Sequence, residues 1–274
     1  MVQRIVLALA LILIIALGFL VPSLEFLPVL LVVFLGIRSV YELARMFDRH
    51  GVNVNFTIAG SFVILLSAAA LMDLMIVSLA LLGLSMNAAF IWRMKKKPLI
   101  GAWKDVAATS GASIYVGIPI ALLIDLYQQG EPGKIWLAYL LTTVWATDTG
   151  AYIAGKNLGS IPLFPRLSPG KTMEGGFGGL IGAFLPLAVG ALVFPQVFLI
   201  PNPWILICLT LFLSVMSQTG DLAESLLKRD AGVKDSGNAL GKHGGALDRL
   251  DSILFVVAIF TLLLRWIDPS VYAA

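Results

Sequence analysis

The sequence predicts an all-α, polytopic integral membrane protein, and three observations support this fold class. Hydrophobic residues make up 59% of the 274 residues, and charged residues make up only 13%. A soluble domain carries about 25% charged residues, so this chain has too few charges to cover a soluble surface. The apolar residues also fall into runs of the length that a helix needs to cross a bilayer. The same composition excludes a disordered chain, which would be polar and highly charged.

Nine apolar runs are predicted to be membrane-spanning helices, because a helix needs about 20 apolar residues to cross the hydrocarbon core. They are 5–21, 27–45, 56–74, 75–92, 107–126, 135–154, 175–194, 204–216 and 253–267. The third and fourth runs form a tight hairpin near Asp73. The eighth run is short and is compatible with a helix that continues past Ser217 into a polar cavity. No small-residue cleavage site follows the first run, so it is interpreted as an uncleaved anchor.

The placement of positive charge predicts the orientation of these helices. With the N-terminus in the cytoplasm, only Lys134 and Arg265 of the 19 Lys and Arg residues fall on the outer side, as the positive-inside rule requires. The C-terminus then lies outside. The chain divides into an N-terminal transmembrane region of four helices, 1–106, and a C-terminal transmembrane catalytic region of five, 107–274. The basic run 93–104 indicates a topology anchor beside anionic lipid headgroups, with direct contact to an acidic substrate as the alternative.

Polar residues concentrate in two stretches that this topology places on the cytoplasmic side, 145–174 and 217–252. Ionisable residues beside membrane spans are costly, so they indicate a functional site. The second stretch begins as a helix, continues as a Gly-rich loop and ends at the start of another helix. Glycines before a helix let backbone N–H groups approach an anion, and carboxylates near lysines and arginines suit a polyphosphate bound through Mg²⁺. An ordinary charged loop with helix caps is the alternative.

Other kinds of site are excluded by residue counts and spacing. Cys208 is the one cysteine, which excludes an internal disulfide and a Cys-rich metal site. Two histidines argue against a His-based metal site. Gly170-Lys171-Thr172 resembles the end of a P-loop, but Pro165 stands where that motif needs a glycine.

The second stretch resembles the signature of the phosphatidate cytidylyltransferases, also called CDP-diacylglycerol synthases. The residues that carry the resemblance are Ser225, Leu227, Lys228-Arg229, Lys234-Asp235, Gly237, Leu240, Gly241, His243-Gly244-Gly245, Asp248-Arg249 and Asp251. Their spacing matches throughout, and the one departure is Ala246, where the family usually has a larger apolar residue. The segments 148–152 and 168–175 are similar to another part of the family's pattern.

The resemblance implies that the protein transfers CMP from CTP to phosphatidate, which gives CDP-diacylglycerol and pyrophosphate for phospholipid biosynthesis. The lipid phosphate would attack the α-phosphorus of CTP. A phosphomonoester is largely ionised near pH 7, so positioning and charge neutralisation matter more than a strong general base. CTP, phosphatidate and membrane lipid are the expected partners, and nucleic acid is not expected. The glycine-rich spans are compatible with a homodimer. A bacterial inner membrane is the expected location, with the active site facing the cytoplasm.

The candidate site residues are assigned by their chemistry and by this resemblance. Asp221 and Asp248 are the predicted Mg²⁺ ligands, expected at the starts of the two helices that flank the loop. Two cations about 4 Å apart could be bridged by this pair. Asp148 and Asp251 are further metal candidates, for which capping or a salt bridge is the alternative. The predicted catalytic residues are Asp221, Asp248, Lys171, Lys228, Arg229 and His243. The predicted substrate contacts are Ser168, Lys171, Thr172, Ser225, Lys228, Arg229, Lys234, His243, Gly244, Gly245 and Arg249.

Alternatives remain for several residues and for the function. A cation at the membrane edge is the alternative role for Lys171, Lys228 and Arg229, and ordering of the loop is the alternative for His243. Lys234, Asp235 and Arg249 could instead form structural ion pairs. The second enzyme hypothesis is a CTP-dependent enzyme that acts on another lipid, such as a polyprenol kinase or an archaeal lipid cytidylyltransferase. The hypothesis outside the enzymes is a transporter, although the sequence shows no evident inverted repeat.

Overall fold

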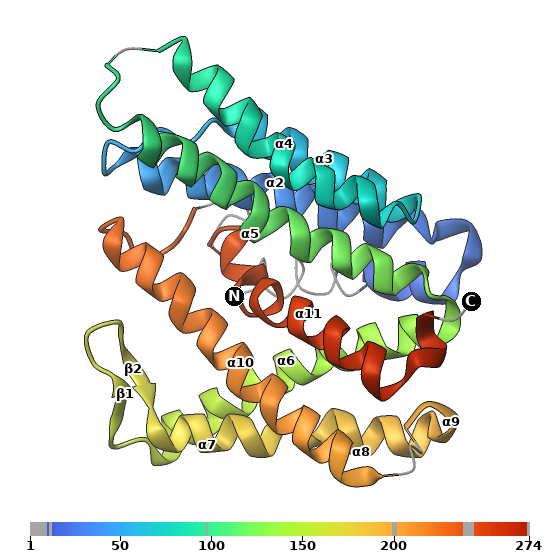
Figure 1. Cartoon of the computed structure of the whole chain (residues 1–274). Coiled ribbons are helices and arrows are strands. Elements are labelled where there is room, and N and C mark those ends of the chain that lie inside the picture. The colour runs from blue at the N-terminus through green and yellow to red at the C-terminus, as the bar shows by residue number, and fades with distance from the viewer. Residues whose placement is uncertain (1–9, 11–12, 97, 199–201, 238–243, 273–274) are drawn as a thin grey trace. The chain divides into compact units, whose positions relative to one another are not determined.

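The computed structural model describes residues 10, 13–96, 98–198, 202–237 and 244–272. The described chain is nearly all α-helical (Figure 1). The elements are η1 (Pro22–Leu24), α2 (Phe26–Asp48), α3 (Phe56–Leu71), α4 (Met75–Met94), α5 (Ala102–Gln128), α6 (Gly130–Leu158), β1 (Pro162–Phe164), β2 (Ser168–Thr172), α7 (Met173–Gly182), α8 (Phe184–Val193), α9 (Pro195–Phe198), α10 (Pro203–Asp230), α11 (Leu247–Ile267) and η3 (Pro269–Tyr272). They form two compact units. The first unit comprises the described parts of Met1–Asp125 and Asp230–Leu250, and the second comprises those of Leu126–Arg229 and Asp251–Ala274.

Six helical segments of the described chain are long and apolar enough to cross a membrane, which indicates an integral membrane protein. They are η1 with α2, α4, α5, α7 with α8, α10 and α11. Helix α3 is apolar but shorter. Residues 5–9, 11 and 12 of the predicted span 5–21 lie outside the described residues. Nine spans, the orientation of the termini and the two-region division therefore stay predictions.

In the first unit, α3 packs against both α2 and α4 (Figure 1). The turn between α3 and α4 is tight, as predicted, and Asp73 adopts a left-handed backbone conformation in it (φ 52°). Arg93, which the sequence groups with the basic run, is buried, and its Nε donates to Asp105 Oδ2 at 2.7 Å. Asp105 also accepts a hydrogen bond from Asn53 N at 2.8 Å. Asp105 therefore ties the end of α4 and the loop before α3 to α5.

In the second unit, the core surrounds Trp136, which is fully buried. Its ring contacts Tyr139, Phe198 and Phe260, with ring centroids 4.9–6.3 Å apart. The indole N–H donates to Asp268 Oδ2 at 3.1 Å, so the one polar atom of this ring has a partner. The aromatic cluster joins α6, α9, α11 and the end of the chain.

Helices α6 and α7 lie side by side along a contact formed by glycines. Small residues at such a contact let two helix backbones approach closely. A Cβ on Gly178 would lie 2.2 Å from Ala154 Cβ and 2.7 Å from Gly150 O. Because these glycines are used within the chain, they give no support to a homodimer, which stays an untested prediction.

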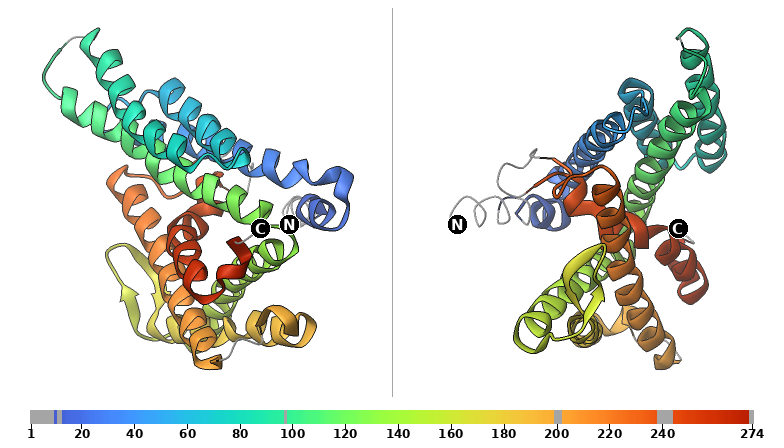
Figure 2. Two further views of the ribbon diagram at one scale, coloured as in Figure 1. Left: turned by 45° about the vertical axis from the view of Figure 1, so that its right-hand side comes forward. Right: turned by 90° about the vertical axis from the view of Figure 1, so that its left-hand side faces the viewer.

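The fold departs from the all-α prediction in the segment between α6 and α7. There β1 and β2 form an antiparallel hairpin that pairs Pro162 with Thr172 and Phe164 with Ser168. The hairpin stands at one end of the α6–α7 pair (Figures 1 and 2). Its strands are short, at 3 and 5 residues. They lack the alternating apolar pattern that predicts a strand.

We expect Gly178→Ala to destabilise the protein, because its Cβ would overlap the Ala154 methyl group and overpacking costs about 1–3 kcal/mol. The melting temperature in detergent should fall. Gly83→Ala on α4 is the control, since a Cβ there meets nothing within 4 Å and alanine favours a helix over glycine by about 1 kcal/mol. Equal melting temperatures for the two variants would contradict the close α6–α7 contact.

Candidate active site

A cavity of about 450 Å³, lined by several charged side chains as well as apolar surface, opens in the second unit. Its wall combines α6, the β-hairpin, the start of α7 and the middle of α10. Asp148, Lys171, Thr172 and Asp221, all singled out in the sequence, line it together with Lys156. The structure therefore brings residues from both polar stretches of the sequence to one place.

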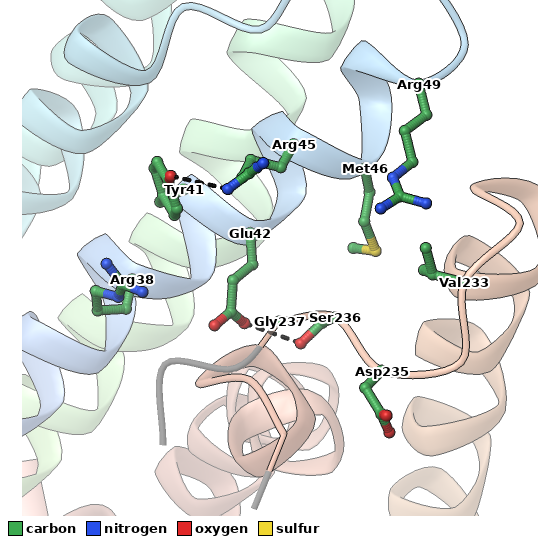
Figure 3. Close-up of a pocket in the computed structure, with 10 residues that line it drawn as sticks. All are labelled: Arg38, Tyr41, Glu42, Arg45, Met46, Arg49, Val233, Asp235, Ser236 and Gly237. Carbon is green, nitrogen blue, oxygen red and sulfur yellow. Dashed lines mark hydrogen bonds between the residues drawn. The ribbon is translucent and has the colours of Figure 1, made fainter. Parts of the chain in front are cut away.

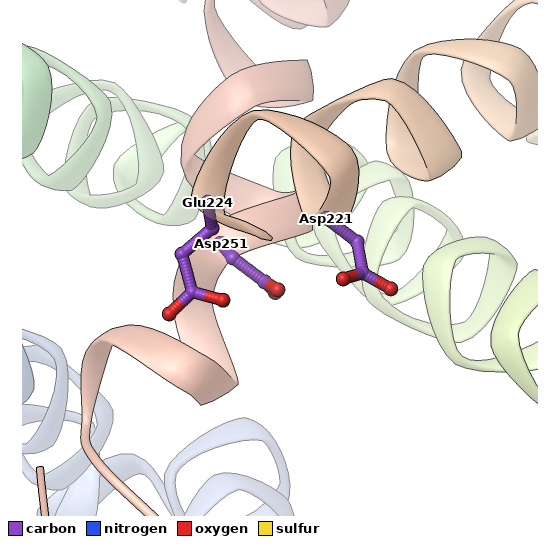
Figure 4. A group of neighbouring side chains, drawn as sticks. All are labelled: Asp221, Glu224 and Asp251. Carbon is purple, nitrogen blue, oxygen red and sulfur yellow. The ribbon is translucent and has the colours of Figure 1, made fainter. Parts of the chain in front are cut away.

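Three carboxylates gather beside this cavity, from α10 and α11 (Figure 4). Oxygen atoms of Asp221, Glu224 and Asp251 all lie within 4.8 Å of one another. Gly220 makes this approach possible, because a Cβ there would lie 2.7 Å from Phe255 Cβ and 3.0 Å from Ser252 Cα. The α11 backbone thus passes close to α10 one residue before Asp221.

Two lysines neutralise part of this negative charge. Lys171 Nζ lies 2.6 Å from Asp221 Oδ2, and Lys228 forms an ion pair with Glu224 one helical turn earlier. Glu224 is fully buried, and a buried charge is stable only when it is paired and hydrogen-bonded. The site is therefore a compact group of three anions and two cations.

The hairpin that carries Lys171 is fixed at both ends. The Glu174 carboxylate accepts hydrogen bonds from Ser160 Oγ and from Ile161 N. Thr172 caps α7, since its Oγ1 accepts from Gly175 N at 3.1 Å. These contacts hold β2, and with it Lys171, against the start of α7.

Helix α10 also holds the hairpin and α7 from the other side. Arg229 Nε donates to Leu167 O in the hairpin turn at 3.0 Å. Gln218 Nε2 donates to Gly176 O on α7 at 3.3 Å. Arg229, predicted as a phosphate ligand, therefore has a positioning contact as well.

The chemistry of the carboxylate cluster suits a divalent cation of the Mg²⁺ type. Mg²⁺ takes oxygen ligands at about 2.1 Å in octahedral geometry, so two ligand oxygens lie about 3–4 Å apart. The spacing within the Asp221, Glu224 and Asp251 group is close to that range. All three donors are carboxylates, the hard ligands that this cation prefers.

In the first unit, the Gly-rich loop is organised around a buried carboxylate of α2. Glu42 is 2% exposed and accepts hydrogen bonds from Ser236 Oγ at 2.8 Å, Ala246 N at 2.9 Å and Leu247 N at 3.0 Å. It therefore fixes both the segment that follows α10 and the start of α11.

Asp248 has a related role at the second position of α11. Its carboxylate accepts hydrogen bonds from Gly245 N at 2.6 Å and Ser236 N at 3.2 Å. Asp248 is thus at the start of its helix, as predicted. Asp221, in contrast, lies inside α10, which runs unbroken from Pro203 to Asp230, so its predicted place at a helix start is wrong. Their pairing on a metal stays a prediction, because the two aspartates belong to different units.

The remaining predicted residues divide between the two units. Second-unit residues outside the cavity wall are Ser168 on β2, Ser225, Lys228 and Arg229 on α10, and Asp251 on α11. First-unit residues are Lys234, Gly244, Gly245, Asp248 and Arg249. His243 lies outside the described residues.

Two acidic residues that the structure brings to these sites were missed in the sequence. Glu224 stands three residues after Asp221 and four before Lys228, a spacing that shares one helix face, so its position could have indicated it. Glu42 had no local signal, since its partners are 194–205 residues away.

We expect Glu42→Ala to loosen the start of α11, because it leaves three buried donors without their acceptor at about 1–3 kcal/mol each. Hydrogen exchange at the Ala246 and Leu247 amides should accelerate. Glu42→Gln retains one carboxamide acceptor and should show a smaller effect. Asp48→Ala, at an exposed position of the same helix, is the control and should leave both amides protected.

Comparisons with known proteins agree with the resemblance. A family model described as "Cytidylyltransferase family" matches residues 2–267. The phosphatidate cytidylyltransferase of Bacillus subtilis (strain 168) is 45% identical over 161 residues, 58% of each chain. The proteins of that name from Staphylococcus aureus (strain COL) and Staphylococcus haemolyticus (strain JCSC1435) are 43% and 42% identical over 164 and 163 residues, 60% of each chain. The matched part thus spans about three fifths of the length of these relatives.

Proposed function

Because the chain belongs to the cytidylyltransferase family, we propose that it transfers CMP from CTP to phosphatidate, giving CDP-diacylglycerol and pyrophosphate. The observation that carries this proposal is the group of Asp221, Glu224 and Asp251 with Lys171 and Lys228, beside the cavity of the second unit. The printed name of the relatives, phosphatidate cytidylyltransferase, supports the choice of phosphatidate as the acceptor.

The proposed reaction brings two phosphate-bearing anions together, so its main demand is compensation of negative charge. Lys171 reaches into the cavity on a braced hairpin, and we assign it to a phosphate of CTP or of the lipid. Lys228 and Arg229 are proposed to contact further phosphate oxygens. The lipid phosphate is its own nucleophile, so no side chain has to remove a proton.

Asp221, Glu224 and Asp251 are the residues that would hold Mg²⁺, with Asp148 in the cavity wall as a further acidic group. A bound cation would supply neutralisation of the charge that develops on the pyrophosphate. For the carboxylates to serve as ligands, Lys171 and Lys228 exchange their present partners for substrate phosphates. The ion pairs therefore keep the lysines close to the positions where the proposed substrate needs them.

We also propose the finer topology that the sequence predicts. Nine spans, a cytoplasmic N-terminus and an outer C-terminus would place both polar stretches at the cytoplasmic face of a bacterial inner membrane. That face is where cytosolic CTP and a membrane-held phosphatidate headgroup can meet. A cavity that combines charged side chains with apolar surface suits one water-soluble and one lipid substrate.

We expect Asp221→Asn, Glu224→Gln and Asp251→Asn each to lower turnover by about 100-fold or more, because each weakens the cation site that stabilises the leaving group. The assay uses purified protein in detergent with Mg²⁺, phosphatidate and CTP labelled at the α-phosphate, and it measures label in the organic phase. Asp230→Asn, an exposed aspartate at the end of α10, is the matched control and should retain full activity.

The assay tests the reaction, the metal assignment and the lipid acceptor separately. Label in the organic phase from the parent protein alone would support both the reaction and the carboxylates. Normal turnover in the three carboxylate variants would contradict the metal assignment but leave the reaction standing. If a folded parent labels another lipid acceptor and not phosphatidate, the proposed substrate is wrong.

A further inference from the structure

A second polar pocket lies in the first unit, between one face of α2 and the segment that follows α10 (Figure 3). Arg38, Arg45 and Arg49 line it from α2. Their spacing of seven and four residues places all three guanidinium groups on the same side of the helix. Ser236 and Gly237 contribute the opposite wall. None of these residues lines the cavity of the second unit.

The pocket carries an excess of positive charge. The guanidinium groups of Arg38 and Arg49 form no ion pair or hydrogen bond with any residue that the structure describes. Arg45 donates to the neutral hydroxyl of Tyr41 at 3.3 Å. The Glu42 carboxylate is occupied by three donors of the first unit. Asp235, the other carboxylate of the lining, points away from the arginines in Figure 3.

The walls of this pocket are held in place. Glu42 anchors Ser236, and Asp248 accepts from the Ser236 amide, so the loop wall is fixed from two directions. The Tyr41 ring lies 5.0 Å from the Arg38 guanidinium and 5.8 Å from that of Arg45, which orients both side chains. The volume is about 250 Å³, roughly that of eight water molecules. A pocket of this volume can hold a phosphate-bearing group.

We propose that this pocket binds a phosphate-bearing anion, held by Arg38, Arg45 and Arg49. Guanidinium groups match phosphate oxygens in paired hydrogen bonds, and Arg is the side chain best suited to such contacts. Two sources have this chemistry: a soluble polyphosphate such as pyrophosphate, and the phosphomonoester headgroup of a lipid. The proposal does not depend on the reaction assigned to the second unit.

The test maps protection of individual arginines from phenylglyoxal, an arginine-modifying reagent, in the full-length protein in detergent. Modification of Arg49 is measured by mass spectrometry with inorganic pyrophosphate, or with phosphatidate in mixed micelles. Sodium chloride and phosphatidylcholine micelles are the respective blanks. Arg265, an exposed arginine of the second unit, is the reference residue. Because the readout is local, a second phosphate site in the other unit does not affect it.

We expect one or both ligands to protect Arg49 and not Arg265. In Arg38→Gln, the ligand concentration for half-protection of Arg49 should rise about tenfold, since a charge-assisted hydrogen bond is lost. Lys104→Gln, an exposed cation of the same unit, removes equal charge and should leave the value unchanged.

Protection by pyrophosphate alone identifies a soluble polyphosphate as the ligand, and protection by phosphatidate alone identifies the lipid headgroup. Equal protection of Arg49 and Arg265 would overturn the proposal. An unchanged half-protection concentration in Arg38→Gln would overturn it as well, as would an equal rise in Lys104→Gln. The wild-type comparison of Arg49 with Arg265 requires no variant, so it decides the matter even if Arg38→Gln fails to fold.

Discussion

Two lysines stabilise an arrangement of carboxylates that would otherwise repel one another. Glu224 is wholly buried, and its oxygens lie within 4.8 Å of those of Asp221 and Asp251. Like charges at this distance destabilise a protein strongly where water is excluded. Lys171 and Lys228 offset that repulsion by pairing with Asp221 and Glu224. The fold of the second unit holds the two lysines beside these carboxylates.

Each neighbouring element has a part in that arrangement. The glycine contact between α6 and α7 brings the two helices close enough for the hairpin at their end to reach α10. Glu174 and Thr172 then fix the strand that carries Lys171. Lys228 needs no such support, because it lies one helical turn after Glu224 on the same helix. One cation thus depends on the tertiary fold and the other on local helix geometry.

The sequence predicts those features whose signals are local. Apolar runs indicate the helices, and the predicted helical start of the second polar stretch is confirmed, since α10 continues to Asp230. The hairpin was not predicted, because its short strands are stabilised by Glu174, on α7, and by Arg229, 62 residues from Leu167. The same reasoning applies to Arg93. It looked like one more cation of a basic loop, and only its partner Asp105 shows that it is buried.

The same difference between local and long-range signals applies to the candidate site. Asp148, Lys171 and Thr172 could be named from the family's pattern, and they line the cavity. Glu42 could not be named, because nothing near it in the chain distinguishes it from an ordinary helix carboxylate. Its importance comes from donors about 200 residues away, including Ser236. A residue of the N-terminal part of the chain therefore helps to fix Ser236 and the start of α11, which lie within the C-terminal signature.

Helix α10 contacts other elements of the second unit through Gln218, Asp221 and Arg229, whose partners are Gly176, Lys171 and Leu167. Successive residues of a helix are turned by roughly 100°. Inserting or deleting one residue between Gln218 and Asp221 would turn Asp221 and Arg229 away from Lys171 and Leu167. The Glu224–Lys228 pair would keep its own spacing. The spacing of these α10 residues is therefore a matter of helical register. A change in length would be more damaging here than most changes of residue type, whereas the loop after Asp230 has no such rotational constraint.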